Sequence, residues 1–330
     1  METARWAAQE VLDRMPRSPI LACLAVLLAM PVGAQDVEGF WLDMYHAEPT
    51  DGETLMDDLV QSEVIYLGET HSVDRHHALQ TWVVEQLVAR EVPFFLAMEQ
   101  AEFFHQNHLD RYNAGDVDFD ALVEAMDWES RWSNIQDYRQ LIETAHAADA
   151  PIVGINARAE TIRAIGRGGL ESLGEVERGE LPHQLWLGDP DYRRLLKLQL
   201  PVHAGMPEEV LDQVCDAQIA RDATMADRIV RFMDTDEGEG RIAVVIAGSG
   251  HVSFGLGTPD RVRTLLPQVR DRIVLFTVSG ELELSPQEEA MAAGVTITHE
   301  DLRSLGRTVA DYVHAKAEEE PSPPRPEGDS

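Results

Sequence analysis

Residues 64–71, VIYLGETH, and residues 242–251, IAVVIAGSGH, decide the fold of this chain. Each stretch begins with a run of apolar, largely β-branched residues and ends in a glycine followed three positions later by a histidine. Short runs that are apolar throughout, rather than alternating with polar residues, are typical of strands inside a sheet covered on both faces. We therefore expect two buried strands, Val64–Leu67 and Ile242–Ala247, each leading into a Gly-x-x-His turn.

Further segments extend this pattern along the chain. Other apolar runs predict strands at Phe94–Met98, Ile152–Ile155 and, as a candidate fifth, Ile273–Val278. Apolar residues at steps of three and four predict helices at residues 73–88, at residues 138–148 and in a long segment that begins at Pro207. Strands that alternate with helices predict an α/β fold with a mainly parallel central sheet and helices on both faces.

The charge of the chain excludes one class of partner. Its 330 residues include 27 Lys and Arg against 59 Asp and Glu, a formal net charge of −32. Such a chain has no positive field with which to displace counterions from phosphate, so we expect no nucleic-acid partner. The acidity predicts a solvated, soluble surface, with an acidic cleft that attracts cations as the alternative. The 44% of hydrophobic residues can supply a sizeable core.

The first 34 residues resemble a secretion signal. Arg14 and Arg17 precede the apolar run Ile20–Met30, and small residues follow it up to Ala34. The run is too short to span a bilayer, for which about 20 residues are needed. Cys23 lies near the start of the run rather than after it, which argues against a lipid anchor. We expect cleavage near Ala34 and a periplasmic or secreted protein without a membrane tether, while association with the outer membrane or cell surface stays open.

The mature chain is expected to be one domain with a tail. Residues 35–315 contain no long low-complexity linker and predict a single α/β domain. Residues 316–330 are rich in Pro and Glu and predict a disordered acidic tail. Once the signal is removed, Cys215 is the one cysteine left, so no internal disulfide is expected.

Polar residues stand where the predicted strands end. Glu69 and His71 follow the first strand, Glu99 the second and His251 the last, with His71 and His251 180 positions apart. In open α/β sheets the reactive groups gather at the carboxyl ends of the strands. We therefore expect one pocket lined by Glu69, His71, Glu99 and His251. Six further residues are expected at its margin: Gly68, His76, Gln80, Asn156, Gly248 and Gly250.

Two kinds of chemistry fit these four side chains. Two imidazoles with carboxylates can hold a divalent ion such as Zn, Mn, Fe or Co. Without a metal, a carboxylate can orient a histidine that serves as general base. The glycines at the strand exits, Gly68 and Gly248, would permit the sharp turns through a positive φ.

For two other groups of residues, we expect a structural role rather than a functional one. Residues 128–138 concentrate Trp128, Trp132 and Tyr138, which predicts core anchoring, with the walls of a ligand slot as the alternative. On the long helix, Arg221 and Asp222 lie close in sequence to Gln218 and Met225. The Arg221 and Asp222 pair is expected at the protein surface.

An ordered set of motifs identifies a family resemblance. The stretches are GETHSVDRHHALQ (68–80), AMEQ (97–100), the segment from Trp128 to Glu160, DPDYRR (189–194), QIARDATMADRI (218–229) and AGSGHVSFGLGTP (247–259). Together they resemble the ChaN family of haem-binding uptake proteins, over roughly residues 63–278. The wider superfamily includes the Tiki proteins, described as metal-dependent proteases, the TraB proteins and erythromycin esterase, a hydrolase without an obligatory metal. The paired Gly-x-x-His motifs match its hallmark at Gly68, His71, Gly248 and His251.

This resemblance supports one hypothesis and leaves a second open. Resemblance to ChaN implies an exported protein that binds haem or iron and acts in their acquisition, with a haem axial ligand that the sequence does not identify. The alternative is a hydrolase, an esterase or protease, in which the four polar residues hold a metal ion or activate water. The absence of a lipobox cysteine departs from the usual ChaN pattern. The substrate, the metal and the oligomeric state stay open.

Overall fold

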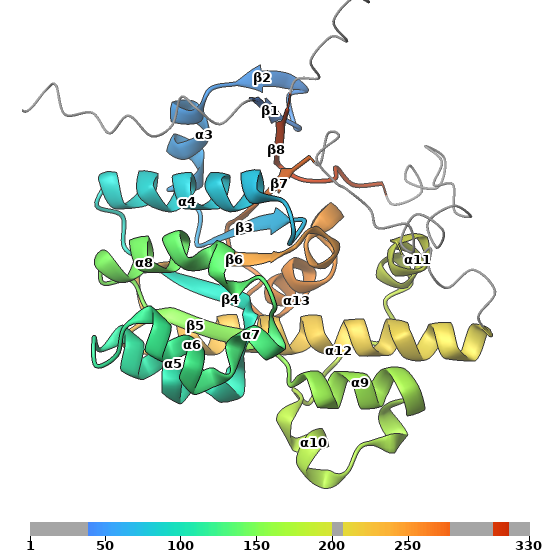
Figure 1. The fold of residues 1–330 in the computed structure, drawn as a ribbon. Coiled ribbons are helices and arrows are strands. Elements are labelled where there is room, and N and C mark those ends of the chain that lie inside the picture. The colour runs from blue at the N-terminus through green and yellow to red at the C-terminus, as the bar shows by residue number, and fades with distance from the viewer. Residues whose placement is uncertain (1–38, 200–206, 278–305, 317–330) are drawn as a thin grey trace, which may run out of the picture. The chain divides into compact units, whose positions relative to one another are not determined.

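The computed structural model describes residues 39–199, 207–277 and 306–316 (Figure 1). The predicted signal peptide, residues 1–34, lies outside the described residues, as does the predicted tail apart from Lys316. The domain boundaries therefore stay predictions. Among the described residues, no helix is both long enough and apolar enough to cross a membrane.

One eight-stranded sheet forms the centre of the molecule. Its strands, in chain order, are β1 (Phe40–Asp43), β2 (Glu48–Thr50), β3 (Val64–Glu69), β4 (Phe94–Glu102), β5 (Ile152–Asn156), β6 (Ile242–Gly248), β7 (Asp271–Phe276) and β8 (Tyr312–Ala315). In space the order is β2-β1-β8-β7-β3-β6-β4-β5. Strands β8 to β5 run parallel, and β1 pairs antiparallel with both β8 and β2. The predicted α/β fold with a mainly parallel sheet is confirmed.

Helices connect the parallel strands from β3 to β7 along the chain. The α-helices are α3 (Gly52–Leu59), α4 (Asp74–Ala89), α5 (Gln106–Asn113), α6 (Phe119–Met126), α7 (Trp128–Arg131), α8 (Arg139–Ala147), α9 (Ala159–Gly168), α10 (Glu175–Glu180), α11 (Pro190–Gln199), α12 (Glu208–Met233) and α13 (Thr258–Leu265). Single 3-10 turns are η1 (Phe103–His105), η2 (Ile135–Tyr138), η3 (Leu170–Ser172), η5 (Ser249–His251) and η6 (Ser253–Gly255). The three predicted helices correspond to α4, α8 and α12.

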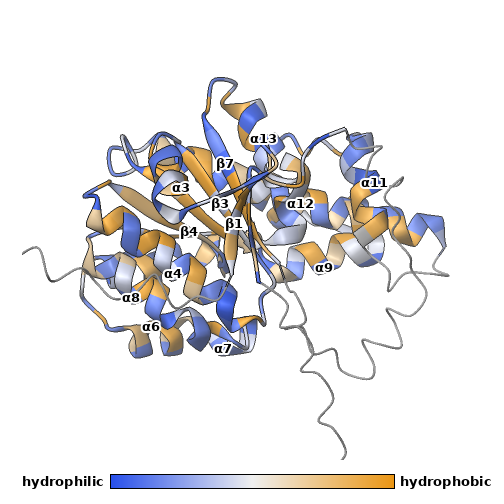
Figure 2. Cartoon of the chain, turned by 90° about the horizontal axis from the view of Figure 1, so that it is seen from above, coloured by the Kyte–Doolittle hydropathy of each residue, from blue (hydrophilic) through white to orange (hydrophobic). Residues whose placement is uncertain are grey.

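The strands place alternate side chains in two separate cores. On β6, Val244 and Ile246 pack into a core formed with α3, α4, α6 and α8. Their neighbours Val245 and Ala247 pack on the opposite face against α12 and α13. In Figure 2 the strands at the centre of the sheet are coloured mainly orange, the colour of hydrophobic residues. Burial on both faces explains why the central strands are apolar throughout instead of alternating.

Two features of the sheet differ from the sequence prediction. Strand β4 continues to Glu102, so Glu99 lies within the strand rather than after it. The pairing of β4 with β5 shifts register between Met98 and Glu102, which accounts for the extra length beyond the apolar run. Strands β1, β2 and β8 were not predicted, because they are three or four residues long and lack a continuous apolar run.

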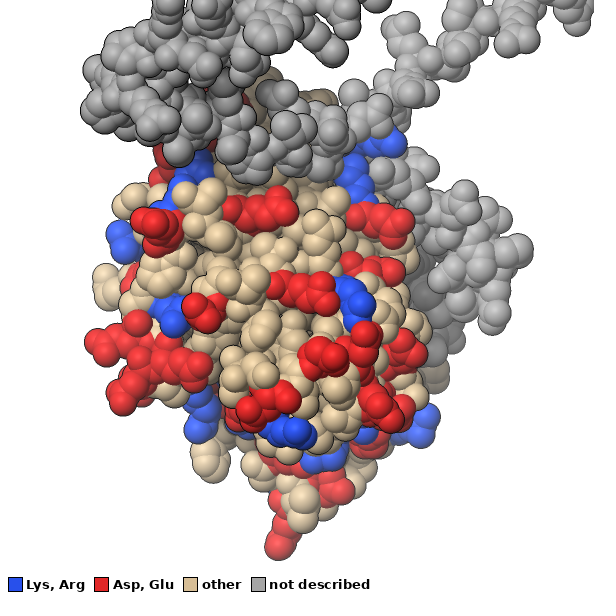
Figure 3. Space-filling view, turned by 60° about the vertical axis from the view of Figure 1, so that its left-hand side comes forward, with Lys and Arg blue, Asp and Glu red and all other residues tan. Residues whose placement is uncertain are grey.

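The acidic side chains do not form one cleft on the face shown in Figure 3. They are spread over that face, with basic side chains between them. This distribution matches the solvated surface expected from the composition.

We predict that Gly68 is required for packing inside β3. A Cβ atom at this position would lie 2.4 Å from Leu275 Cδ2 and 2.7 Å from Val252 Cγ2. Forcing a methyl group into a packed core costs about 1–3 kcal/mol. Gly68→Ala should therefore lower the free energy of unfolding in urea by that amount.

The matched control is Gly179→Ala, where no atom would lie within 4 Å of the added Cβ and the residue is already helical. This change should leave the protein as stable or slightly more stable, because alanine favours the helix. Equal stability of the two variants would contradict the packing argument.

Candidate functional site

Three adjacent strands carry the predicted site residues. Strand β6 lies between β3 and β4 in the sheet. Glu69 is the last residue of β3, Glu99 lies on β4, and Gly248 ends β6. The chain thus brings two carboxylates to the same end of the sheet, on either side of the β6 terminus.

Glu69 is the centre of the first half of the site. Its carboxylate is fully buried and accepts four hydrogen bonds. The donors are His71 Nδ1 at 2.8 Å, Gln80 Nε2 at 2.7 Å, Gln100 Nε2 at 2.8 Å and the Tyr138 hydroxyl at 2.5 Å. A buried carboxylate is tolerated when its lone pairs are satisfied, so these donors explain how Glu69 can lie inside the protein.

His251 is the centre of the second half. Its Nε2 lies 3.1 Å from Glu99 Oε1, and its Nδ1 lies 2.7 Å from Asp222 Oδ1. Asp222 also accepts from the hydroxyls of Thr258, at 2.9 Å, and Tyr192, at 2.5 Å. One buried imidazole is therefore held between two buried carboxylates.

Gly248 joins the two halves by its lack of a side chain. Its N–H donates to Glu99 Oε2 at 2.7 Å. A Cβ atom at this residue would lie 2.9 Å from His71 Nε2 and 3.6 Å from Glu99 Oε2. The four predicted side chains thus come together around this glycine. Its φ is −58°, so the predicted positive φ is wrong, and close approach is the reason for glycine here.

The charges of this cluster are strongly coupled. Burial lowers the pKa of His251, but attraction to Glu99 and Asp222 outweighs it and raises the pKa to about 10. Burial opposes ionisation of Glu99 as well, but His251 and His71 hold the pKa of this carboxyl well below its usual range. The pKa of His71 is also raised: burial lowers it, but the hydrogen bond that His71 donates to Glu69 and attraction to Glu99 prevail. At neutral pH His251 is an imidazolium, which does not suit the hypothesis of a general base.

The margin residues have different surroundings. Gln80 contacts Glu69, and Asn156 Nδ2 donates to the backbone oxygen of Glu99 at 2.8 Å. His76 accepts from the N–H of Thr70 at 2.9 Å, and its other ring nitrogen lies 3.2 Å from the backbone oxygen of Thr277. Its ring therefore faces away from the Glu69 carboxylate. Of the remaining predicted residues, Gly68 packs inside β3 and Gly250 lies in the turn η5.

Sequence reasoning missed the role of Asp222. The prediction that Asp222 lies at the surface with Arg221 is wrong, since Asp222 is fully buried. Because Gln218, Asp222 and Met225 follow at steps of four and three, they share one face of α12, and that face packs on the sheet. The core position of Met225 was the signal that could have placed Asp222 inside.

The aromatic cluster of residues 128–138 proves to be a core anchor, as expected. Trp128 and Tyr138 are almost fully buried, and Trp128 Nε1 donates to the backbone oxygen of Gln100 at 2.7 Å. Trp132 is only partly buried and meets the ring of His71 edge-on, with 4.8 Å between the ring centroids. The cluster therefore fixes two donors of Glu69, Gln100 and Tyr138.

The comparisons with known proteins settle the family. A model described as haem-binding uptake, Tiki superfamily, ChaN matches residues 55–262, well over half of the chain. The chain belongs to the ChaN family. The matched range contains both Gly-x-x-His motifs and all four predicted site residues.

A solved ChaN structure shares this fold. A structure titled as cofacial haem binding to ChaN of Campylobacter jejuni is 21% identical, with a TM-score of 0.61, and the match covers 84% of this chain and 96% of that one. An erythromycin esterase mutant in its open conformation is 12% identical, with a TM-score of 0.41, covering 72% of this chain and 76% of that one. No curated protein matches.

We predict that this ChaN-family chain becomes less stable at high pH, because His251 then loses the proton that makes it an imidazolium. Because its folded pKa of about 10 exceeds the 6.5 of an ordinary histidine, its stabilisation is fully present below pH 6.5 and is lost as the pH rises through 10. Urea unfolding of the wild type should therefore show a midpoint that falls across this range. The fall should be smaller in His251→Gln, which has lost the titrating ring.

The control for general charge repulsion is His183→Gln, at an exposed histidine. This variant should follow the wild type at every pH. The ¹⁵N signals of the wild-type rings give a second measurement that needs no variant, since one ring should stay doubly protonated at pH 8. Identical pH profiles for all three proteins, with every ring neutral at pH 8, would contradict the assignment.

Proposed function

We propose that this chain binds haem, and that the axial ligand is Tyr45 on its surface. The observation that supports haem binding is membership of a family described by that property. The place of the ligand is inferred from the structure. Tyrosine and histidine are both established axial ligands of haem iron in proteins.

The polar cluster itself does not fit haem. Both ring nitrogens of His251 face carboxylates, so neither is free to bind iron. In His71, Nδ1 is bound to Glu69, and Nε2 lies beside Gly248 and Glu99, in polar rather than apolar surroundings. Haem needs a flat apolar slot beside a free ligand atom, and a set of buried carboxylates supplies neither.

Tyr45 fits the role of an axial ligand. The chain has six tyrosines, and Tyr45 is 84% exposed whereas the other five are buried. It lies in the turn between β1 and β2, where its N–H donates to Asp43 Oδ1 at 2.9 Å. This bond holds the turn, so the phenol projects from a fixed backbone into solvent.

His46 lies beside Tyr45 in the same turn. The two rings meet edge-on, with 5.2 Å between their centroids. The hydrogen bond that His46 Nδ1 donates to Asp43 raises the pKa of His46, which favours its charged form. Phe40, which is 43% exposed, adds apolar surface on β1, the strand that leads into this turn.

The test is a titration of the purified full chain with hemin. Wild type should give a Soret shift that saturates at a fixed haem-to-protein ratio. Tyr45→Phe removes one exposed oxygen and no packing, so this variant should fold normally and lose the saturable shift. His71→Ala and His251→Ala, where folded, should keep it.

Two outcomes would overturn parts of this proposal. No saturable shift in the wild type would remove haem binding altogether. A shift that survives Tyr45→Phe and disappears in His71→Ala would move the haem to the polar cluster.

Export and a role in haem or iron uptake belong to the same proposal. They are supported by the family description and by the signal sequence expected in residues 1–34. Cell fractionation of the full-length chain, with N-terminal sequencing of the mature protein, tests export: an intact residue 1 in the cytoplasmic fraction would contradict it.

A hydrolase is the second candidate, and one observation favours it. The side chain of His71 is 37% exposed while its Nδ1 is bound to the buried carboxylate of Glu69. This is how a general base is oriented, with the other nitrogen left to accept a proton from water.

We expect that any such activity on activated esters rises with pH through the pKa of His71, which is raised above its usual value, because the base must be neutral. His71→Ala should abolish the activity, and Tyr45→Phe should leave it unchanged. Equal rates in the wild type and His71→Ala would reject this candidate. Because the two variants affect different functions, each result identifies which proposal failed.

A further inference from the structure

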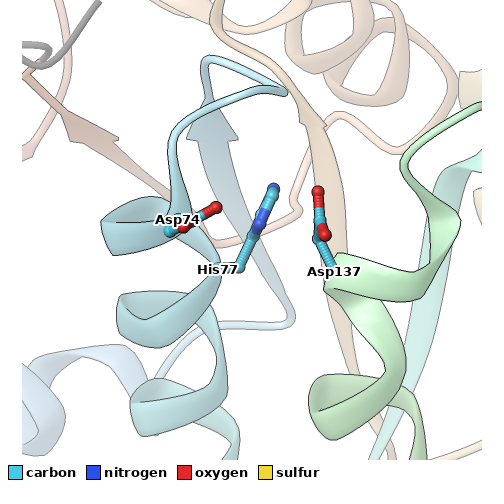
Figure 4. Close-up of side chains that lie close together, drawn as sticks. All are labelled: Asp74, His77 and Asp137. Atoms are coloured by element: carbon cyan, nitrogen blue, oxygen red, sulfur yellow. The ribbon is translucent and has the colours of Figure 1, made fainter.

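We propose that Asp74, His77 and Asp137 bind one divalent transition-metal ion, such as Zn²⁺, Mn²⁺ or Co²⁺. One ligand atom from each residue lies within 4.8 Å of the other two (Figure 4). Among the described residues this is the one set of three or more His, Cys, Asp or Glu side chains with such a spacing. The four residues expected from the sequence to bind a metal do not form such a set.

Two elements position the three side chains. Asp74 and His77 are three residues apart in the first turn of α4, so they lie on the same side of the helix. Asp137 comes from the turn η2, which is the last part of the aromatic cluster of residues 128–138. Figure 4 shows the imidazole between the two carboxylates. The ring of His77 packs against Tyr138, with 4.3 Å between the centroids, which holds it in this position.

The state of His77 is the observation that points to a ligand. This residue is 5% exposed, yet neither of its ring nitrogens makes a hydrogen bond. The distance from His77 Nε2 to Glu69 Oε2 is 3.5 Å, and Glu69 already has four donors. A buried polar group without a partner costs about 1–3 kcal/mol, and a metal ion bound to the ring would remove that cost.

The donor set matches a divalent ion in charge and chemistry. Two carboxylates balance the charge of the ion, and a neutral imidazole completes three protein ligands. Nitrogen and oxygen donors of this kind suit Zn, Mn and Co, and three protein ligands leave positions open for water. Asp74 and Asp137 are exposed, so an ion can reach the site from solvent, while the buried His77 closes its inner side.

The site is distinct from the proposed haem ligand and from the His251 half of the cluster. It is next to the Glu69 half, because the ring of His77 contacts Tyr138 and approaches Glu69. A bound ion would therefore add a positive charge beside the carboxylate that orients His71. This inference does not depend on haem binding.

The experiment is a titration of the chelator-treated full chain with Co²⁺, followed by absorption, and competition with Zn²⁺. Wild type should bind one Co²⁺ with ligand-field bands that Zn²⁺ removes. Loss of residues that only support metal ligands weakens binding about 10–100-fold, so the loss of a direct ligand in Asp137→Asn should weaken it at least about tenfold. His77→Gln should abolish the bands.

The matched control is Asp116→Asn, an equal change of charge at an exposed acid outside the site. It should bind Co²⁺ as the wild type does, and so should Tyr45→Phe. Equal weakening in Asp116→Asn and Asp137→Asn would show only general attraction by an acidic surface, and would overturn the proposal. Bands that persist in His77→Gln but vanish in His71→Ala would also overturn it, by moving the ion to the polar cluster.

Discussion

The structure depends on burying two carboxylates, Glu69 on β3 and Glu99 on β4, at the same end of the sheet on either side of β6. Taking an ionised carboxylate out of water costs several kcal/mol unless charges and hydrogen bonds replace the water. Glu69 meets this cost with four side-chain donors, and Glu99 meets it with a backbone N–H and the imidazolium of His251. Each donor must be held in place, so the constraint extends into the surrounding elements.

This constraint explains features of the sequence that are distant from the site. Trp128 and Tyr138 anchor a segment whose main effect here is to fix donors of Glu69. On the other side, α11 and α12 supply Tyr192 and Asp222, which hold His251. Replacing buried ionic groups by apolar ones is often neutral or stabilising, so stability alone does not account for a cluster of this size. Its retention favours a function that uses fixed charge.

The sequence predicts the frame of the site better than its interior. Continuous apolar runs located the central strands because both faces of the sheet are covered, and the repeated Gly-x-x-His located His71 and His251. The buried position of Asp222 was not predicted, because a charged residue on a helix is normally exposed. The place of His77 in a site was not predicted, because its surroundings depend on η2, a single 3-10 turn that carries no periodic pattern. Short strands such as β8 were not predicted because they lack a continuous apolar run.

Haem binding and a charged cluster within one small fold require different surfaces. Haem binding needs an apolar face and one free ligand atom, and Tyr45 offers that atom on the edge of the sheet formed by β1 and β2. The cluster needs buried, mutually satisfied polar groups, and β3, β6 and β4 supply them at the centre of the sheet. In sheet order, β8 and β7 lie between β1 and the central strands. Because the two requirements fall on different strands, one family fold can keep its charged centre while a ligand site at the edge changes, and family membership alone does not fix the chemistry of the centre.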